Sequence, residues 1–451
     1  MTSQKIVANE QQAAARPEEQ LRESTDQFKK AGGFDLLEAV IDDAQNLNPA
    51  RKARREIFLN EASKKTGRRD LLQRLNIWEQ ALSDSGDAVE IASRCEQNLE
   101  ETDTVLKANL KNALDQTRDL EQSYRSVGLF FKNAEEDKVN NVSLMNADME
   151  QLTDLDFSRF IDVVSETLSS NYDRLDLREN YSLLVIPGYL GSNAVLEKWM
   201  KIAHENKVML ITDFDNFDTP DDVMEMFEAA NLTGGERHRS NVIMTCNWIR
   251  GRERVVEVGE DDSLYIPAAG AYAGKIYGTL MSQVAAGKKF GSINEVDSVR
   301  FSLKKSEIAN IEKLGLVPMV SEYGKVMAFS AKTLFNGDNL GLQTYSVVRV
   351  FDYITKVLMD FLNRRAFENF DSRTKKNLLR QIVTFLDSVT GPDNLIENFD
   401  IRRFEQDPDK KDHINLDVHL RPFFPAKNFL IKMDGHKGDD GNEWDAEYEQ
   451  H

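Results

Sequence analysis

The apolar positions of this chain change their spacing from one region to the next. Between residues 50 and 135 they recur at helical spacing, and the stretch is almost free of proline. One stripe holds Leu71, Leu72, Leu75, Trp78 and Leu82, and another holds Val105, Leu106, Leu110, Leu114 and Leu120. The bulky residues of 123–134 close the stretch. The pattern predicts three or more packed helices in a bundle-like subdomain.

The N-terminal residues divide into a polar lead and one short helix. Residues 1–30 are polar and predict a flexible segment. Residues 34–47 follow Gly32 and Gly33, and their apolar side chains share one helical face: Leu36, Leu37, Val40, Ile41 and Ala44. A partner's groove would accept such a face. Docking of the helix on its own domain explains the same pattern.

From about residue 140, apolar runs bounded by turn residues alternate with helical stretches. The predicted strands are 142–145, 182–187, 208–213, 242–246, 299–303 and 326–330. The predicted helices are 157–170, 193–206, 220–231, 271–286 and 305–313. This order predicts an α/β domain whose sheet is covered on both faces. A charged insertion at 247–268 predicts a surface loop or hairpin.

Residues 345–370 form the clearest helical pattern. Its predicted buried stripe is Val347, Phe351, Ile354, Leu358 and Phe361. The opposite face carries Arg349, Asp352, Lys356, Asp360 and Asn363 at spacings of three and four, which suits intrahelical ion pairs on a solvated surface. A second helix is predicted at 372–389, ended by Gly391 and Pro392.

Period-two alternation appears near the end of the chain, on both sides of a Pro-Phe-Phe-Pro turn. Val418 and Leu420 alternate with polar residues before the turn, and Phe429, Ile431 and Met433 do so after it. Phe423 and Phe424 form the turn between Pro422 and Pro425. A short strand pair without a local sheet has open edges, so we expect an arm that pairs with neighbouring subunits. The alternative is a hairpin that closes its own domain's sheet.

Composition narrows the class of protein. The chain has 451 residues, enough for two or three domains, and a net charge of -19, which argues against nucleic acid and anionic membranes as partners. Two distant cysteines indicate a reducing compartment. No apolar run approaches the roughly 20 residues of a membrane span, and no signal peptide is evident. We therefore expect a soluble cytoplasmic protein.

No catalytic constellation is found in the sequence. The apolar run before Asp213 resembles a nucleotide-binding strand, but no GxxxxGK[ST] motif accompanies it. Asp213, Asp215 and Asp218 lack the closing glutamate of a calcium loop. The six histidines show no common metal spacing. We expect no catalytic residue, no cofactor and no metal, and the missing site favours a structural or assembly role.

Five stretches, taken in order, resemble the large sheath subunits of type VI secretion systems, the TssC/VipB family. They are residues 34–44, 123–134 (SYRSVGLFFKNA, similar to a WRGLHYLV block, with Tyr124 in place of Trp), 307–334, 344–365 and 418–433 (similar to FLRPHFQLEELTVSLRLV). Residues 150–300 match poorly. The family's Phe-Ala-His on the long helix is replaced by Val350-Phe351-Asp352-Tyr353. The resemblance indicates a divergent member.

The resemblance implies partners that spacing alone does not give. Members of the family pair with a small subunit, TssB, and polymerise into a helical sheath around an inner tube of Hcp, on a membrane-anchored baseplate. Strands of neighbouring protomers share one sheet, a role that falls here on the arm. Helix 345–362 would line the inner wall, with Arg349, Asp352, Lys356 and Asp360 facing the tube. Leu36, Leu37, Val40 and Ile41 would bind the ClpV unfoldase.

These inferences give a mixed α+β fold with an N-terminal helical region, a central α/β sheath domain, and C-terminal long helices with a strand arm shared between protomers. The expected division is 1–48 (lead and amphipathic helix), 49–135 (helical subdomain), 136–344 (α/β domain), 345–399 (inner-wall helices), 400–435 (strand arm) and 436–451 (polar tail). Two other functions stay open: a homopolymeric phage-tail-like sheath protein, and a nucleotide hydrolase around Asp213.

Overall fold

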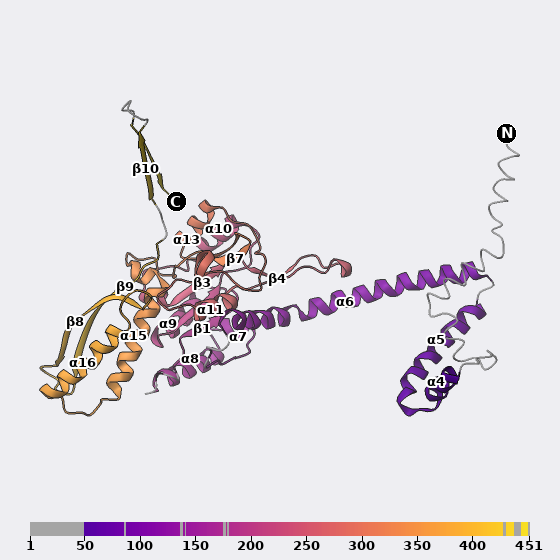
Figure 1. Ribbon diagram of the computed structural model, residues 1–451, viewed down its shortest axis with the longest axis horizontal. Helices are drawn as coiled ribbons and strands as arrows, with labels where there is room; N and C mark the ends of the chain where they lie inside the picture. Colours follow the sequence, from indigo (N-terminus) through magenta and orange to yellow (C-terminus); the bar gives the residue numbers. More distant parts are fainter. Residues whose placement is uncertain are drawn as a thin grey trace. The chain divides into compact units, whose positions relative to one another are not determined.

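The computed structural model describes residues 49–84, 87–135, 139, 141–174, 177, 180–426, 430–436 and 443–449 (Figure 1). The helix predicted at 34–47 lies outside these residues. The chain divides into two compact units, Met1–Leu110 and Lys111–His451. The fold is the expected mixture: helices in the N-terminal region, a central sheet with helices, and helices with strands in the C-terminal region.

The described residues of the first unit, 49–84 and 87–110, are helical but do not form a packed bundle. It contains α4 (Pro49–Asn60), a 3-10 turn (Ala62–Lys64), α5 (Lys65–Asp84) and the start of α6 (Ala88–Asn133). The Arg68 guanidinium donates to the carbonyl oxygens of Phe58 and Glu61, at 2.7 and 2.8 Å, and so ties α5 to the end of α4. Among the described side chains of 53–110 none is buried. The predicted stripes are therefore present as helix faces, whereas their burial was predicted wrongly for this unit.

The second unit is built on a five-stranded sheet. Its order is β1 (Leu183–Ile186), β2 (Met209–Asp213), β3 (Val242–Cys246), β6 (Val317–Glu322) and β7 (Lys325–Ala328). The first four strands are parallel, and β6 and β7 form an antiparallel hairpin. All residues of β2 and β3 are buried, as their near-continuous apolar runs predict.

In the central sheet domain, two predicted strands are absent and one strand of the sheet was missed. Residues 142–145 form no strand, and 299–303 contribute only a bridge between Val299 and Ile249. The missed strand, β6, carries Pro318, which argues against a strand because proline cannot donate to a ladder. Pro318 is tolerated because β6 pairs with β3 over only two residues, Val317 and Pro318.

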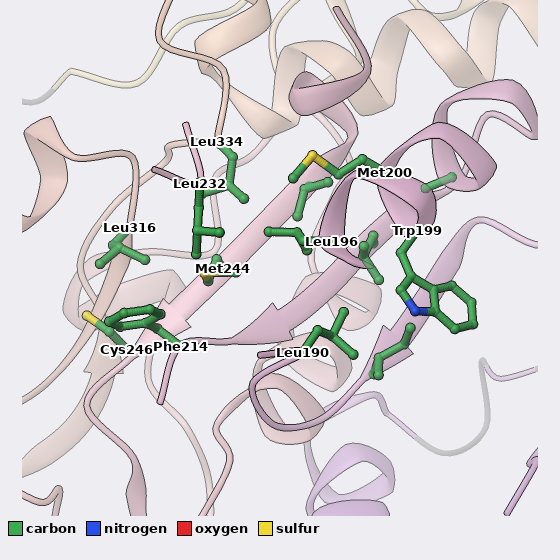
Figure 2. Close-up of a cluster of buried hydrophobic side chains, with 14 of the residues drawn as sticks. Leu190, Leu196, Trp199, Met200, Phe214, Leu232, Met244, Cys246, Leu316 and Leu334 are labelled. Carbon is green, nitrogen blue, oxygen red and sulfur yellow. The ribbon is translucent and has the colours of Figure 1, made fainter. Parts of the chain in front are cut away.

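Helices cover both faces of this sheet. They are α7 (Met149–Thr153), α8 (Arg159–Tyr172), α9 (Asn193–Glu205), α10 (Pro220–Ala230), α11 (Ala269–Gly278), α12 (Gly287–Phe290), α13 (Lys305–Lys313) and α14 (Leu340–Gln343). One core cluster holds Leu210, Val242 and Met244 with side chains of α8, α9, α10 and α13 (Figure 2). Another holds Met209, Ile211 and Ile243 with α11. The α/β prediction is thus confirmed, although α11 ends at Gly278 and not at 286.

The C-terminal part of α6 packs closely on α11. A methyl group at Gly270 would lie 2.7 Å from the carbonyl oxygen of Ser126, and one at Gly274 would clash with that of Phe130. Only glycine allows two helix backbones to approach so closely. The insertion forms a hairpin of β4 (Ile249–Arg252) and β5 (Leu264–Ile266), with a 3-10 turn (Val256–Val258) between the strands. Another 3-10 turn, Arg237–Asn241, precedes β3.

The C-terminal region has its own core. Helices α15 (Tyr345–Asn363) and α16 (Ser372–Ser388) pack with a hairpin of β8 (Ile396–Gln406) and β9 (Ile414–Pro422). The buried residues of this third cluster are Val350, Ile354, Leu358, Leu378, Ile382, Leu386, Ile396 and Phe404. A second hairpin joins β10 (Leu430–His436) to β11 (Glu443–Glu449). Strand β8 was not predicted, and the tail 436–451, expected to be loose, contains β11.

Candidate functional site

The strands predicted around the Pro-Phe-Phe-Pro turn are present, but they do not pair with each other. Strand β9 pairs antiparallel with β8, from Gln406 opposite Ile414 to Ile396 opposite Pro422. Its inner face is half-buried in the third core cluster through Leu416, Val418 and Leu420, while Asp417, His419 and Arg421 on the other face are exposed. The alternation is confirmed, and β9 has a partner within its own chain.

The strand after the turn, β10, pairs with β11. The register runs from Leu430 opposite Glu449 to His436 opposite Glu443. Phe423 is half-buried and Phe424 exposed, whereas Phe429 lies outside the described residues, as do the side chains of Ile431 and Met433. Each hairpin is a sheet of two strands. A two-stranded sheet leaves an outer edge on each strand that another strand can join.

The charged face of α15 is turned into the molecule, contrary to the sequence prediction. Arg349 is 8% exposed and Lys356 9% exposed. Arg349 Nη1 donates to the carbonyl oxygen of Ile276 at 3.4 Å, near the C-terminal end of α11. Lys356 Nζ donates to the carbonyl oxygen of Tyr181 at 2.9 Å and lies 5.7 Å from the ring centre of Tyr172. Burial lowers the pKa of Arg349 to about 10 and that of Lys356 to about 8.

The carboxylates of this face are also engaged within the chain. Asp352 Oδ2 accepts from Asn241 Nδ2 at 2.8 Å, and its Oδ1 lies 4.0 Å from Lys207 Nζ. Burial raises the pKa of Asp352, although these neighbours act against the shift. Asp360 pairs with Arg364 at 2.9 Å. The contacts of Arg349, Asp352 and Lys356 fix α15 against the central sheet domain, whereas the Asp360 pair lies within the end of α15, so in this structure the face does not present four free charges to a partner.

One residue departs from the predicted buried stripe, and one residue that the pattern did not assign is exposed. Phe351, assigned to the buried stripe, is 39% exposed. Met359 is exposed two turns further along α15. The exposed face of α15 is therefore partly apolar and lies between the two faces that the sequence suggested.

Asp213 is the chemically most conspicuous group, and it is fully enclosed. Its carboxylate accepts from Gly188 N at 3.0 Å, from Ala269 N at 2.9 Å and from the Thr245 hydroxyl. Burial raises its pKa to about 6, although each of these donors lowers it. The side chain ties the loop after β1, the end of β3 and the start of α11 together. The Asp213 side chain is completely buried.

The residues expected to bind the unfoldase, Leu36, Leu37, Val40 and Ile41, lie outside the described residues. Among the residues that the structure describes, no group of three or more His, Cys, Asp or Glu side chains is placed to hold a metal ion. Within the same residues, no helix is long and apolar enough to cross a bilayer.

Fold and surfaces together define a class: a mixed α/β protein with a helix-covered sheet and a C-terminal region of helices and two-stranded hairpins. Three family models match the chain in order. They describe the N-terminal region of TssC/VipB-like proteins (residues 21–110), the central domain of type VI secretion system TssC/VipB (112–336) and the TssC/VipB-like C-terminal domain (344–450). The chain belongs to the TssC/VipB family. It is therefore a subunit of the contractile-sheath type, and the middle, 150–300, falls inside the central match.

Solved structures of low identity resemble the fold. A chain of the anti-feeding prophage baseplate matches at 16% identity and a TM-score of 0.47, covering 67% of this chain and 77% of that one. A chain of the contracted helical sheath of the same prophage matches at 17% and 0.46, covering 67% and 78%. The sheath tail protein of Desulfitobacterium hafniense matches at 12% and 0.39, covering 65% and 59%. The search of curated proteins found no match.

Proposed function

We propose that this chain is the large subunit of a type VI secretion contractile sheath, which co-polymerises with the small subunit TssB around an Hcp tube. The observation that carries the proposal is the ordered match of all three family models from residue 21 to residue 450. The polymer would assemble in the cytoplasm on a membrane-anchored baseplate, with other copies of this chain as neighbours. Its work would be mechanical, without bond-making catalysis.

The C-terminal hairpins support this proposal. Strand exchange between protomers needs strands with unpaired outer edges, and both β8–β9 and β10–β11 are sheets of two strands. Because β9 already pairs with β8, the neighbour's strands would extend the hairpins at their edges and would not replace a missing partner. The arm of Val418, Leu420, Phe423, Phe424, Phe429, Ile431 and Met433 would then contribute the central strands of a shared sheet.

Contraction would draw on two packings of the same interfaces. A gain on the order of a few kcal/mol per subunit becomes large over a polymer of many subunits. Asp360 remains a candidate for the tube contact, while Arg349, Asp352 and Lys356 act by holding α15 in place. Recycling by the ClpV unfoldase through Leu37 and Ile41 is part of the same proposal.

Negative-stain microscopy of the chain, expressed alone and together with a TssB small subunit, tests the proposal. Long hollow tubes only in co-expression are the expected result. Tubes from the chain alone would identify a homopolymeric phage-tail-like sheath instead. Discrete particles in both samples would contradict the sheath assignment.

A further inference from the structure

In the turn between α15 and α16, one aromatic residue combines a left-handed backbone with an exposed side chain. Phe367 has a backbone φ of 70° and is fully exposed. It follows the end of α15, where Arg365 N and Ala366 N still donate to Leu362 and Asn363. Helices commonly end with glycine or asparagine in this left-handed conformation, because a Cβ is strained there. The chain thus accepts both backbone strain and an exposed aromatic ring at one position, a combination typical of contact residues.

Exposed cations follow Phe367 along the chain, beyond the exposed Glu368 and Asp371, although the whole chain has a net charge of -19. Arg373, Lys376 and Arg380 are exposed along α16 at spacings of three and four. Arg380 donates to the Asn377 side chain at 2.8 Å. No ion pair with a carboxylate of the described residues is found for Lys376 or Arg380. We call Phe367 with these three cations the basic tip.

A complementary surface exists on another helix of the same chain. Residues 208–236 contain no lysine or arginine. Within them, α10 exposes Asp221, Asp222, Glu225 and Glu228, and Met226 stands exposed among these carboxylates. A methionine beside acidic groups suits an aromatic ring with neighbouring cations. We call this set the acidic face of α10.

The two surfaces belong to different parts of the fold. The inner side of α10 packs in the first core cluster through Val223 and Phe227, whereas α16 packs in the third through Leu378, Ile382 and Leu386. Two different complementary patches on one chain give a head-to-tail contact between copies, and such contacts build helical polymers when they do not close into a ring.

We infer that the basic tip docks on the acidic face of α10 of a second copy of this chain. Phe367 would contact Met226, and Lys376 and Arg380 would face Glu225 and Glu228. The inference rests on the proposed sheath function and adds to it a contact outside the strand arm. Because the contact is electrostatic and exposed, it would weaken with salt and could be remade in another geometry when the polymer rearranges.

Charge exchange tests the contact. Reversal at the tip (Lys376→Glu with Arg380→Glu) or at α10 (Glu225→Lys with Glu228→Lys) should raise the concentration needed for polymer formation at least about tenfold. The four changes combined should restore assembly, because the attraction is re-formed with opposite sign. The control variant, Lys313→Glu with Lys325→Glu, makes the same charge change as the reversal at the tip, but at exposed sites outside both surfaces. It should assemble as the wild type does.

The variant Phe367→Asn tests whether Phe367 serves the contact between copies or the stability of the fold. Asparagine tolerates the left-handed backbone, so the melting temperature should stay equal or rise. The concentration needed for polymer formation should nevertheless rise about tenfold, as in the reversal variants. Normal assembly of both reversal variants, or a combined variant no better than its parents, would overturn the inference while leaving the sheath function intact.

If the wild-type chain forms no sheath at all, the proposed function fails separately. The same variants are then compared by sedimentation of the soluble chain at low salt. Salt-dependent self-association that disappears on reversal at the tip and returns in the combined variant would still support the contact. Absence of self-association would overturn it.

Discussion

The hydrogen-bond partners of Asp213 explain why this buried position holds a carboxylate. Every hydrogen-bond partner of the Asp213 carboxylate is a donor: two backbone N–H groups and one hydroxyl. An amide side chain would turn its NH2 toward at least one of these donors. Only a group that accepts on both oxygens satisfies the site, and this explains an ionisable residue at the end of a fully buried strand.

We therefore expect Asp213→Asn to destabilise the protein by about 1–3 kcal/mol, the typical cost of an unsatisfied buried polar group. Urea unfolding at pH 7.5 measures it. Asp215→Asn, at an exposed neighbouring position, is the control and should change stability little. Equal stabilities of the two variants would show that the three donors do not require a carboxylate.

Lys356 gives a prediction with a definite pH dependence. Its pKa is lowered by burial to about 8, below the ordinary value of 10.5. Between these two values the unfolded chain holds a proton that the folded chain has lost, so the contribution of this group to stability rises with pH.

The wild type should therefore gain stability relative to Lys356→Met between pH 7 and pH 10, by an amount on the order of 3 kcal/mol. Unfolding of both proteins at the two pH values gives this difference, and the other lysines cancel in it. A difference that stays constant with pH would mean that Lys356 titrates as an exposed lysine does.

At the scale of elements, the sequence predicted best where one apolar period runs unbroken. The runs of β2 and β3 and the caps of α9 and α10 are local signals; Ser192 accepts from Val195 N at 3.3 Å, and Thr219 accepts from Asp222 N at 3.2 Å. Strand β8 was missed because its register shifts twice, between Ile396 and Asn398 and between Ile401 and Arg403, and each bulge breaks the period-two pattern.

The α15 face was misjudged for a different reason. The prediction assumed one core and one solvent face, but α15 serves two cores. Val348 packs in the second cluster and Ile354 in the third, and Figure 1 shows α15 between the sheet and α16. A helix enclosed in this way buries charged residues as well as apolar ones, and a single sequence does not reveal which second surface will cover it.

The C-terminal hairpins allow a test by truncation. Removal of residues 427–451 deletes β10 and β11 but leaves β8, β9 and the third core cluster complete. The truncated chain should keep its melting temperature within a few degrees and lose co-assembly with the small subunit, because the shared sheet lacks strands. Circular dichroism and microscopy measure the two properties. Tubes of normal length from the truncated chain would rule out an essential role for β10 and β11 in assembly.

At the scale of the whole molecule, sequence patterns and family resemblance contributed different things. Patterning predicted a chain with a helical start, an α/β centre and strands near the end, and it excluded familiar catalytic motifs. The expected partners and mechanics came only from the resemblance of five stretches to the family, whereas the family matches show membership of the family. The pairing of β9 and β10 within the chain depends on β8 and β11, whose own signals are weak, so neither source predicted it.

The close approach of α6 and α11 has a mechanical consequence. At Gly274 the helix backbone of α11 meets the backbone of Phe130, and at Gly270 it meets the backbone and the hydroxyl group of Ser126; most of α11 is enclosed by the core beneath the sheet. A side chain under force can change its rotamer, whereas a contact between two helix backbones cannot relax in this way. A pull on the C-terminal part of α6 would pass directly to the sheet. This joint would therefore act as a stiff coupling between α6 and the sheet.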